Sequence, residues 1–96
     1  MNTNIQAIDF NATQALQEFI NKKTAKLVKL FDEIQDVDVH LKVVKPETSK
    51  NKEAQVKAVA PNVNFYASKV CDTFEEAVTE SLEAIERQIE KHKEKK

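Results

Sequence analysis

The feature that most constrains this sequence is the amphipathic pattern of its last stretch, residues 72–96. Apolar residues recur there at steps of three and four, which places them along one face of a helix. These residues are Phe74, Ala77, Val78, Leu82, Ile85 and Ile89. We expect Asp72 to be the N-cap of this helix, with Glu75 three residues later completing a capping box. A helix with one apolar face has to bury that face against another layer of structure.

A second amphipathic helix is predicted from Thr13 to Phe31, with Asn11 or Thr13 as its cap. Four shorter segments alternate apolar and polar residues, as strands with one buried face do. These segments are Thr3–Ile8, Val37–Val43, Glu53–Ala60 and Val63–Ser68. The polar stretch Pro46–Lys52 is predicted to be a loop, and Pro61 with Asn62 a tight turn.

The order strand, helix, three strands, helix predicts an α+β fold with the layout βαβββα. Both apolar helix faces are buried at once if the two helices pack on one face of a four-stranded sheet. The opposite sheet face is then expected to meet solvent; it carries His40, Lys42, Gln55 and Lys57. Residues 1–96 are expected to form one domain, because this length supports a single core.

Composition excludes several classes of protein. No apolar run approaches the roughly 18–20 residues that a membrane span needs, and no signal peptide is visible. The single cysteine, Cys71, cannot form an internal disulfide, which suits a reducing cytoplasm. The chain contains no glycine, which argues against a glycine-rich phosphate-binding loop.

The sequence offers little for catalysis or metal binding. His40 and His92 have no clustered ligands around them, so neither predicts a metal site. Cys71 precedes a helix N-terminus, a position that can lower the pKa of a thiol. No histidine lies near it in the sequence, however, and a lone cysteine at a strand–helix junction is more often simply packed. We therefore expect neither enzymatic activity nor a cofactor.

The net charge of −1 hides a separation of the two signs along the chain. Lys22, Lys26 and Lys29 share a face of the first helix, and Lys23 lies about 100° further round. The charged residues of the last helix are all acidic as far as Glu86 and mostly basic from residue 87 onward. Acid at the start of a helix and base at its end also complement the helix dipole.

The basic residues therefore have two interpretations. In the first they are ordinary solvent-facing side chains, with those near the end of the last helix serving its dipole. In the second they form a site for phosphate groups, in which lysines on two adjacent helices bind a folded RNA by its shape. Only Tyr66 is expected to be an outward-facing aromatic residue on a strand, so stacking of bases on the sheet is not expected.

Over its whole length the chain resembles the family of ribosome hibernation-promoting factors, also called ribosome-associated inhibitor or protein Y, in its short form. The resemblance rests on the order and spacing of four segments. These are Lys22–Asp32 (KKTAKLVKLFD), Leu41–Lys45 (LKVVK), Asp72–Phe74 (DTF) and Glu86–Lys95 (ERQIEKHKEK). The chain departs from the family pattern at Ala84, where members often carry lysine, and in the acidic load of its last helix.

This resemblance implies a non-enzymatic factor of stressed or stationary-phase bacteria that binds the small ribosomal subunit between head and body. There it would occupy the positions of messenger RNA and of the A-site and P-site transfer RNAs, and so inhibit translation. Ribosomal RNA is the implied partner, the cytoplasm the implied location, and the free protein is expected to be a monomer without a small-molecule substrate. The implied contacts are Lys22, Lys23, Lys26, Lys29, Arg87, Lys91, His92, Lys93 and Lys95.

One alternative stays open. The same fold could be a protein–protein interaction module without RNA binding. In that case the charged helices would recognise a protein, and the exposed sheet face or its edge would pair with a partner.

Overall fold

The elements follow one another in the predicted order, in a computed structural model that describes residues 2–8, 10–44 and 50–94. They are β1 (Asn2–Ala7), α1 (Gln14–Leu30), β2 (Asp36–Val43), β3 (Lys52–Ala60), β4 (Val63–Cys71) and α2 (Phe74–Glu94). The predicted α+β fold with the layout βαβββα is thereby confirmed. Within these ranges no helix is both long enough and apolar enough to cross a membrane.

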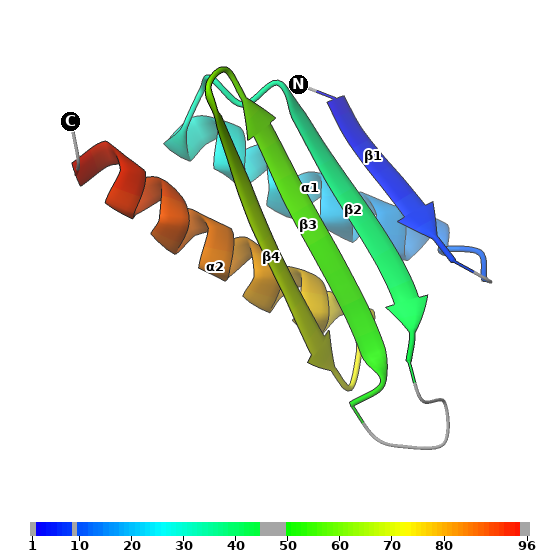
Figure 1. Cartoon of the computed structure of the whole chain (residues 1–96). Coiled ribbons are helices and arrows are strands. Elements are labelled where there is room, and N and C mark those ends of the chain that lie inside the picture. The colour runs from blue at the N-terminus through cyan, green and yellow to red at the C-terminus, as the bar shows by residue number, and fades with distance from the viewer. Residues whose placement is uncertain (1, 9, 45–49, 95–96) are drawn as a thin grey trace.

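The four strands form one sheet in the order β1-β2-β3-β4. β1 pairs in parallel with β2, and the other neighbours are antiparallel. A parallel pair needs a crossover connection, and α1 supplies it. Figure 1 shows both helices on the same side of the sheet, running in the same direction, so that their C-terminal ends lie at the same end of the molecule. This shared end is where the basic segments of the two helices come together.

The core lies between the sheet and the two helices. The predicted apolar faces provide its fully buried residues, among them Ile20 and Leu27 of α1 and Ile85 and Ile89 of α2. The inward positions of the central strands complete it, with Val37, Val39, Leu41, Ala54, Val56 and Ala58 all fully buried. Ser81 of α2 is also buried, and its hydroxyl donates to the backbone carbonyl of Ala54 on β3. This buried hydrogen bond joins the helix layer to the sheet in addition to the apolar packing.

The start of α2 differs from the prediction. Thr73, not Asp72, is the N-cap: its Oγ1 accepts from the backbone N–H of Glu76 at 3.1 Å, and Ala77 N donates to Thr73 O. The Asp72 carboxylate accepts from the backbone N–H of Lys50 at 2.8 Å instead. The reason is that β4 pairs with β3 as far as Cys71, so the chain is still extended one residue before Asp72. The predicted capping box from Asp72 to Glu75 was wrong by one residue.

Other boundaries moved little. Of the two predicted caps for α1, Thr13 is the N-cap, since its Oγ1 accepts from Leu16 N. β4 runs three residues beyond the predicted end at Ser68. The turn at Pro61 and Asn62 is confirmed, and Asn62 has φ 68°, a left-handed conformation that asparagine tolerates in a chain without glycine. Of the predicted loop 46–52, residues 46–49 lie outside the described ranges and Lys52 already belongs to β3.

Candidate nucleic-acid interface

The lysines of α1 occupy its solvent side. Lys22, Lys26 and Lys29 are exposed, as their spacing predicts, whereas Lys23 is half-buried. The ammonium of Lys23 lies 5.4 Å from the ring centroid of Phe19, within the range of a cation–π contact. Three lysines are thus free to meet a polyanion along one helix face, and the fourth is held against an aromatic ring.

The basic end of α2 contributes two exposed cations of the same kind. Arg87 and Lys91 are exposed and stand four residues apart, so they lie on the same side of the helix. Lys91 lies in the last turn of α2 and Lys29 in the last turn of α1, and the two helices end at the same end of the molecule (Figure 1). Lys95, another residue of the expected site, lies outside the described ranges.

His92 and Lys93 have partners inside the molecule. The half-buried His92 ring meets Phe31 and Phe65 edge to face, with centroid distances of 5.7 and 5.8 Å. Lys93 Nζ donates to the backbone carbonyl of Leu30, the last residue of α1, at 2.8 Å. One sign of the first contact is present in the sequence, since His92 follows Ile89 by three residues and so continues the apolar face of the helix.

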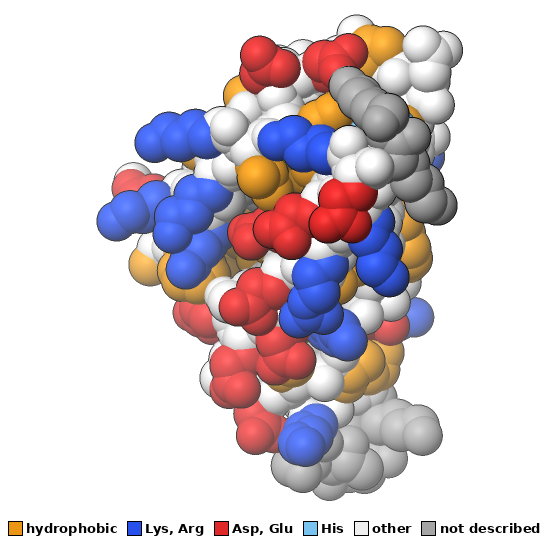
Figure 2. Space-filling model, turned by 90° about the vertical axis from the view of Figure 1, so that its left-hand side faces the viewer, with side chains coloured by type: hydrophobic (Ala, Val, Ile, Leu, Met, Phe, Trp, Pro, Cys, Tyr) orange, Lys and Arg blue, Asp and Glu red, His pale blue; other side chains and the backbone are white. Residues whose placement is uncertain are grey.

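Acidic side chains border the basic ones. Lys23 and Lys26 line a groove of about 140 Å³ between the helices together with Glu83 and Glu86 of α2. In Figure 2, Lys and Arg side chains gather at the upper left of the molecule, and Asp and Glu side chains lie below them. Figure 2 also shows acidic side chains above this basic cluster and basic side chains further down, so the two signs are separated only in part on this face.

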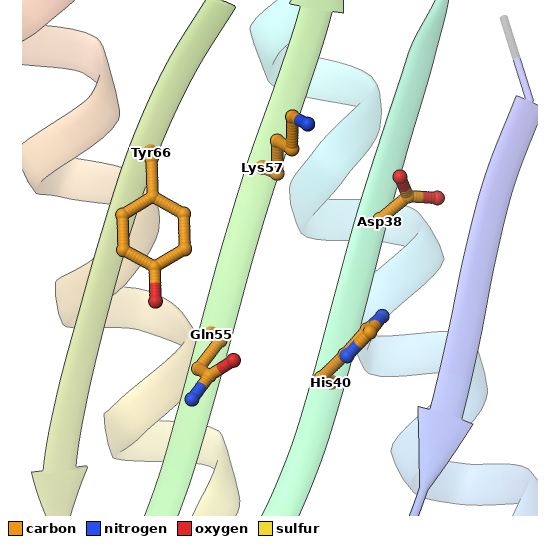
Figure 3. Close-up of a pocket in the computed structure, with 5 residues that line it drawn as sticks. All are labelled: Asp38, His40, Gln55, Lys57 and Tyr66. Carbon is orange, nitrogen blue, oxygen red and sulfur yellow. The ribbon is translucent and has the colours of Figure 1, made fainter.

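The exposed face of the sheet carries a shallow depression that the sequence did not predict. Its volume is about 250 Å³, and Figure 3 shows its lining side chains on β2, β3 and β4: Asp38, His40, Gln55, Lys57 and Tyr66. Tyr66 is 53% exposed, as expected for an outward-facing aromatic residue. Asn4 on β1 donates to the Asp38 carboxylate at 2.9 Å. This face is the surface available to a protein partner in the alternative function.

Cys71 lacks the properties of a catalytic nucleophile. Its side chain is buried, and Sγ donates to Glu80 Oε2 at 3.3 Å. Burial raises the pKa of the Cys71 thiol, and so do the hydrogen bond to Glu80 and the neighbouring carboxylates. The direction is opposite to the lowering that a helix N-terminus can cause, so the thiol stays protonated at neutral pH.

Metal binding finds no support in the part of the chain that the structure describes. There, no group of three or more His, Cys, Asp or Glu side chains is placed to hold an ion.

Residues 3–96 match the family described as "Sigma 54 modulation protein / S30EA ribosomal protein". The ribosome hibernation promoting factor of Escherichia coli strain K12 is 33% identical over 100 residues, which cover 99% of this chain and 96% of that protein. The chain belongs to the ribosome hibernation promoting factor family. A hibernation promoting factor of Pseudomonas putida strain KT2440 is 28% identical over 95 residues, covering 99% of this chain and 89% of that protein.

Solved structures share the fold of this hibernation promoting factor family member. A ribosomal subunit interface protein from Coxiella burnetii superposes with a TM-score of 0.86 at 20% identity, covering 97% of this chain and 98% of that one. The N-terminal domain of Thermus thermophilus Protein Y gives a TM-score of 0.82 at 17% identity, covering 96% and 99%. At these identities the likeness concerns the fold.

Proposed function

We propose that this chain is a ribosome hibernation factor that binds the small ribosomal subunit at its decoding region. There it occupies the positions of messenger RNA and of the A-site and P-site transfer RNAs, and so inhibits translation in the cytoplasm of stressed or stationary-phase cells. The family supports a role at the ribosome. The observation that carries the RNA contact is the exposed row of cations on two helices that end side by side, Lys22, Lys26 and Lys29 with Arg87 and Lys91.

The chemistry of this row suits the phosphate groups of a folded RNA. Lysine side chains are mobile point charges that neutralise phosphates without selecting a base sequence. RNA helices are recognised mostly by shape and backbone, because side chains cannot enter their narrow major groove. Two rows on neighbouring helices can therefore contact two stretches of ribosomal RNA backbone at once. Binding of this kind needs neither a cofactor nor a catalytic residue.

The acidic part of α2 limits the surface. Glu83 and Glu86 line the groove that Lys23 and Lys26 also line, and carboxylates repel phosphate groups. RNA is therefore expected to approach the shared C-terminal end of the helices and the outer face of α1. Lys23, held over Phe19, lies at the margin of this interface.

Charge reversal tests the proposal. Changing Lys22, Lys26, Arg87 and Lys91 together to Glu should abolish co-sedimentation with purified small subunits and relieve inhibition in a reconstituted translation assay. The unfolding transition should stay cooperative, because all four side chains are exposed. Full binding by the folded quadruple variant would refute the proposed interface.

A matched pair of double variants locates the surface. Lys26→Glu with Arg87→Glu reverses two charges on the helix layer, and Lys42→Glu with Lys57→Glu reverses two on the exposed sheet face. The first pair should weaken binding far more than the second. Equal losses of affinity in the two double variants would show that binding depends on the total charge of the protein and not on where the charges lie. Capture of a protein partner that survives ribonuclease, with no ribosomal component, would favour the interaction-module alternative.

A further inference from the structure

Two basic residues near the end of α2, the half-buried His92 and the exposed Lys93, contact other parts of the molecule, although their charge suggests an RNA contact. His92 packs against Phe31, the residue that ends α1, and against Phe65 of β4. The two phenylalanine rings also meet each other edge to face, at 5.7 Å. Three elements thus converge on one cluster of rings, and α2 contributes to it through His92.

Lys93 closes the neighbouring end of α1. The last carbonyl groups of a helix lack partners within the helix and carry partial negative charge. Phe31 N already donates to Leu27 O, and Lys93 Nζ donates to Leu30 O. The Lys93 ammonium group therefore has a favourable partner in the free protein, before RNA binds.

We infer that His92 and Lys93 are positioning residues, which fix the basic end of α2 against α1, and that the phosphate contacts are made by Arg87 and Lys91. This inference rests on the proposed function. Helix ends fray when nothing holds them. With His92 in the ring cluster and Lys93 on Leu30, the last turns of α2 stay helical, so that Arg87 and Lys91 keep a fixed spacing from the α1 lysines.

The salt dependence of binding separates the two roles of a lysine. A phosphate-contacting lysine releases counterions, so its loss lowers the log–log salt slope by about 0.7–0.9. Acetylation of Lys93, by incorporation of acetyllysine, removes the charge but leaves one N–H on Nζ to donate to Leu30 O. We expect acetylation of Lys93 to leave the salt slope for small-subunit binding unchanged. Acetylation of Lys91 should lower the slope by about one contact.

Substitution of His92 supplies the second test. His92→Phe keeps an aromatic ring in the cluster and should bind as the natural chain does. His92→Ala removes the ring and should weaken binding. In the free protein it should also speed amide hydrogen exchange in the last two turns of α2 by about tenfold or more, while exchange near Phe74 stays unchanged.

Each result has a definite meaning. A drop in salt slope on acetylation of Lys93 as large as that for Lys91 would overturn the inference for Lys93. A loss of binding in His92→Phe equal to that in His92→Ala would overturn it for His92. If the natural chain fails to bind small subunits at all, the proposed function fails instead. Amide exchange in the free His92→Ala variant then still shows whether His92 holds the end of α2. Amide exchange in the last two turns of α2 of the Lys93→Met variant tests the same role for Lys93.

Discussion

The side chain of Gln88 on α2 pairs with both backbone groups of Tyr66 on β4. Gln88 Nε2 donates to Tyr66 O at 2.6 Å, and Tyr66 N donates to Gln88 Oε1 at 3.3 Å. β4 is an edge strand, since its neighbour in the sheet is β3. An edge strand offers its backbone groups to any added strand, and proteins commonly block such pairing. The amide of Gln88 occupies the middle of this edge.

Removing that amide should expose the edge. Gln88→Ala is expected to lower the free energy of unfolding by about 1–2 kcal/mol, because two hydrogen bonds are lost. It should also promote self-association, measured by sedimentation velocity at increasing concentration. Glu90→Ala, at an exposed position on the same helix, is the matched control and should change stability by less than about 0.5 kcal/mol. Identical behaviour of the two variants would show that Gln88 does not protect the edge.

The Cys71 thiol should react slowly with disulfide reagents in the folded protein. Its contribution to the free energy of unfolding should be lost at alkaline pH. Its pKa is raised in the folded state above the ordinary 9.0, so its contribution is full below about pH 9 and is lost as the pH rises through the folded pKa. Urea unfolding between pH 7 and 10.5 should show a decline above pH 9 that is flatter in Cys71→Ala. A disulfide reagent at pH 8 should react much faster with the unfolded chain. Rapid reaction of the folded protein would contradict the buried, hydrogen-bonded thiol.

The Thr73 hydroxyl should stabilise the protein by capping the N-terminus of α2. Thr73→Ala is expected to lower the free energy of unfolding by about 1 kcal/mol, because the amide of Glu76 loses its acceptor. Amide exchange at Glu76 should quicken in this variant. Thr73→Ser retains a hydroxyl at the cap and should restore most of the stability. If Ser and Ala at this position behave alike, the hydroxyl is not the cap.

Glu86 should weaken RNA binding through its charge. It lines the groove beside Lys23 and Lys26, so Glu86→Gln removes a repulsion at the margin of the proposed interface. At about 10 Å in water one charge pair is worth about 0.4 kcal/mol, which predicts about a twofold gain in affinity for small subunits at low salt. Glu75→Gln, in the first turn of α2, is the control with the same charge change. An equal gain in both variants would show that only net charge matters.

Local patterns predicted the fold because they agreed with one another. Alternating apolar residues in β2 and β3 predict strands with one buried face, and apolar residues three and four apart predict helices with one buried face. Most of the residues predicted to face inward are buried in the structure. The end of β4 was missed because Lys69, at a position where the alternation calls for an apolar residue, interrupts the pattern before Cys71. The cap of α2 could not be chosen from the sequence. Asp72 and Thr73 are both good caps with a glutamate three residues on, and only the pairing of β4 with β3 decides between them.

For the proposed site, the sequence predicted which lysines share a helix face, but not the contacts that some of the basic residues make inside the molecule. Spacing showed which lysines share a face, and the exposed row on α1 follows from it. The contact of Lys93 with Leu30 joins residues 63 apart in the chain, and that of Gln88 with Tyr66 joins residues 22 apart. Contacts of this range depend on how the helices lie against each other and against the sheet. No local pattern in the sequence encodes that arrangement.

The two helices run in the same direction, so the charged side chains at their ends form a charge distribution with a direction along the helix axes. Glu75 and Glu76 lie in the first turn of α2, Lys91 and Lys93 lie in its last turn, and Lys29 lies in the last turn of α1, so the helix termini form a charge dipole along the helix axes. In the field of a polyanion such a dipole experiences a torque that turns its positive end forward. Encounters would then begin in the correct orientation, and the association rate would depend on ionic strength even though the protein as a whole is repelled.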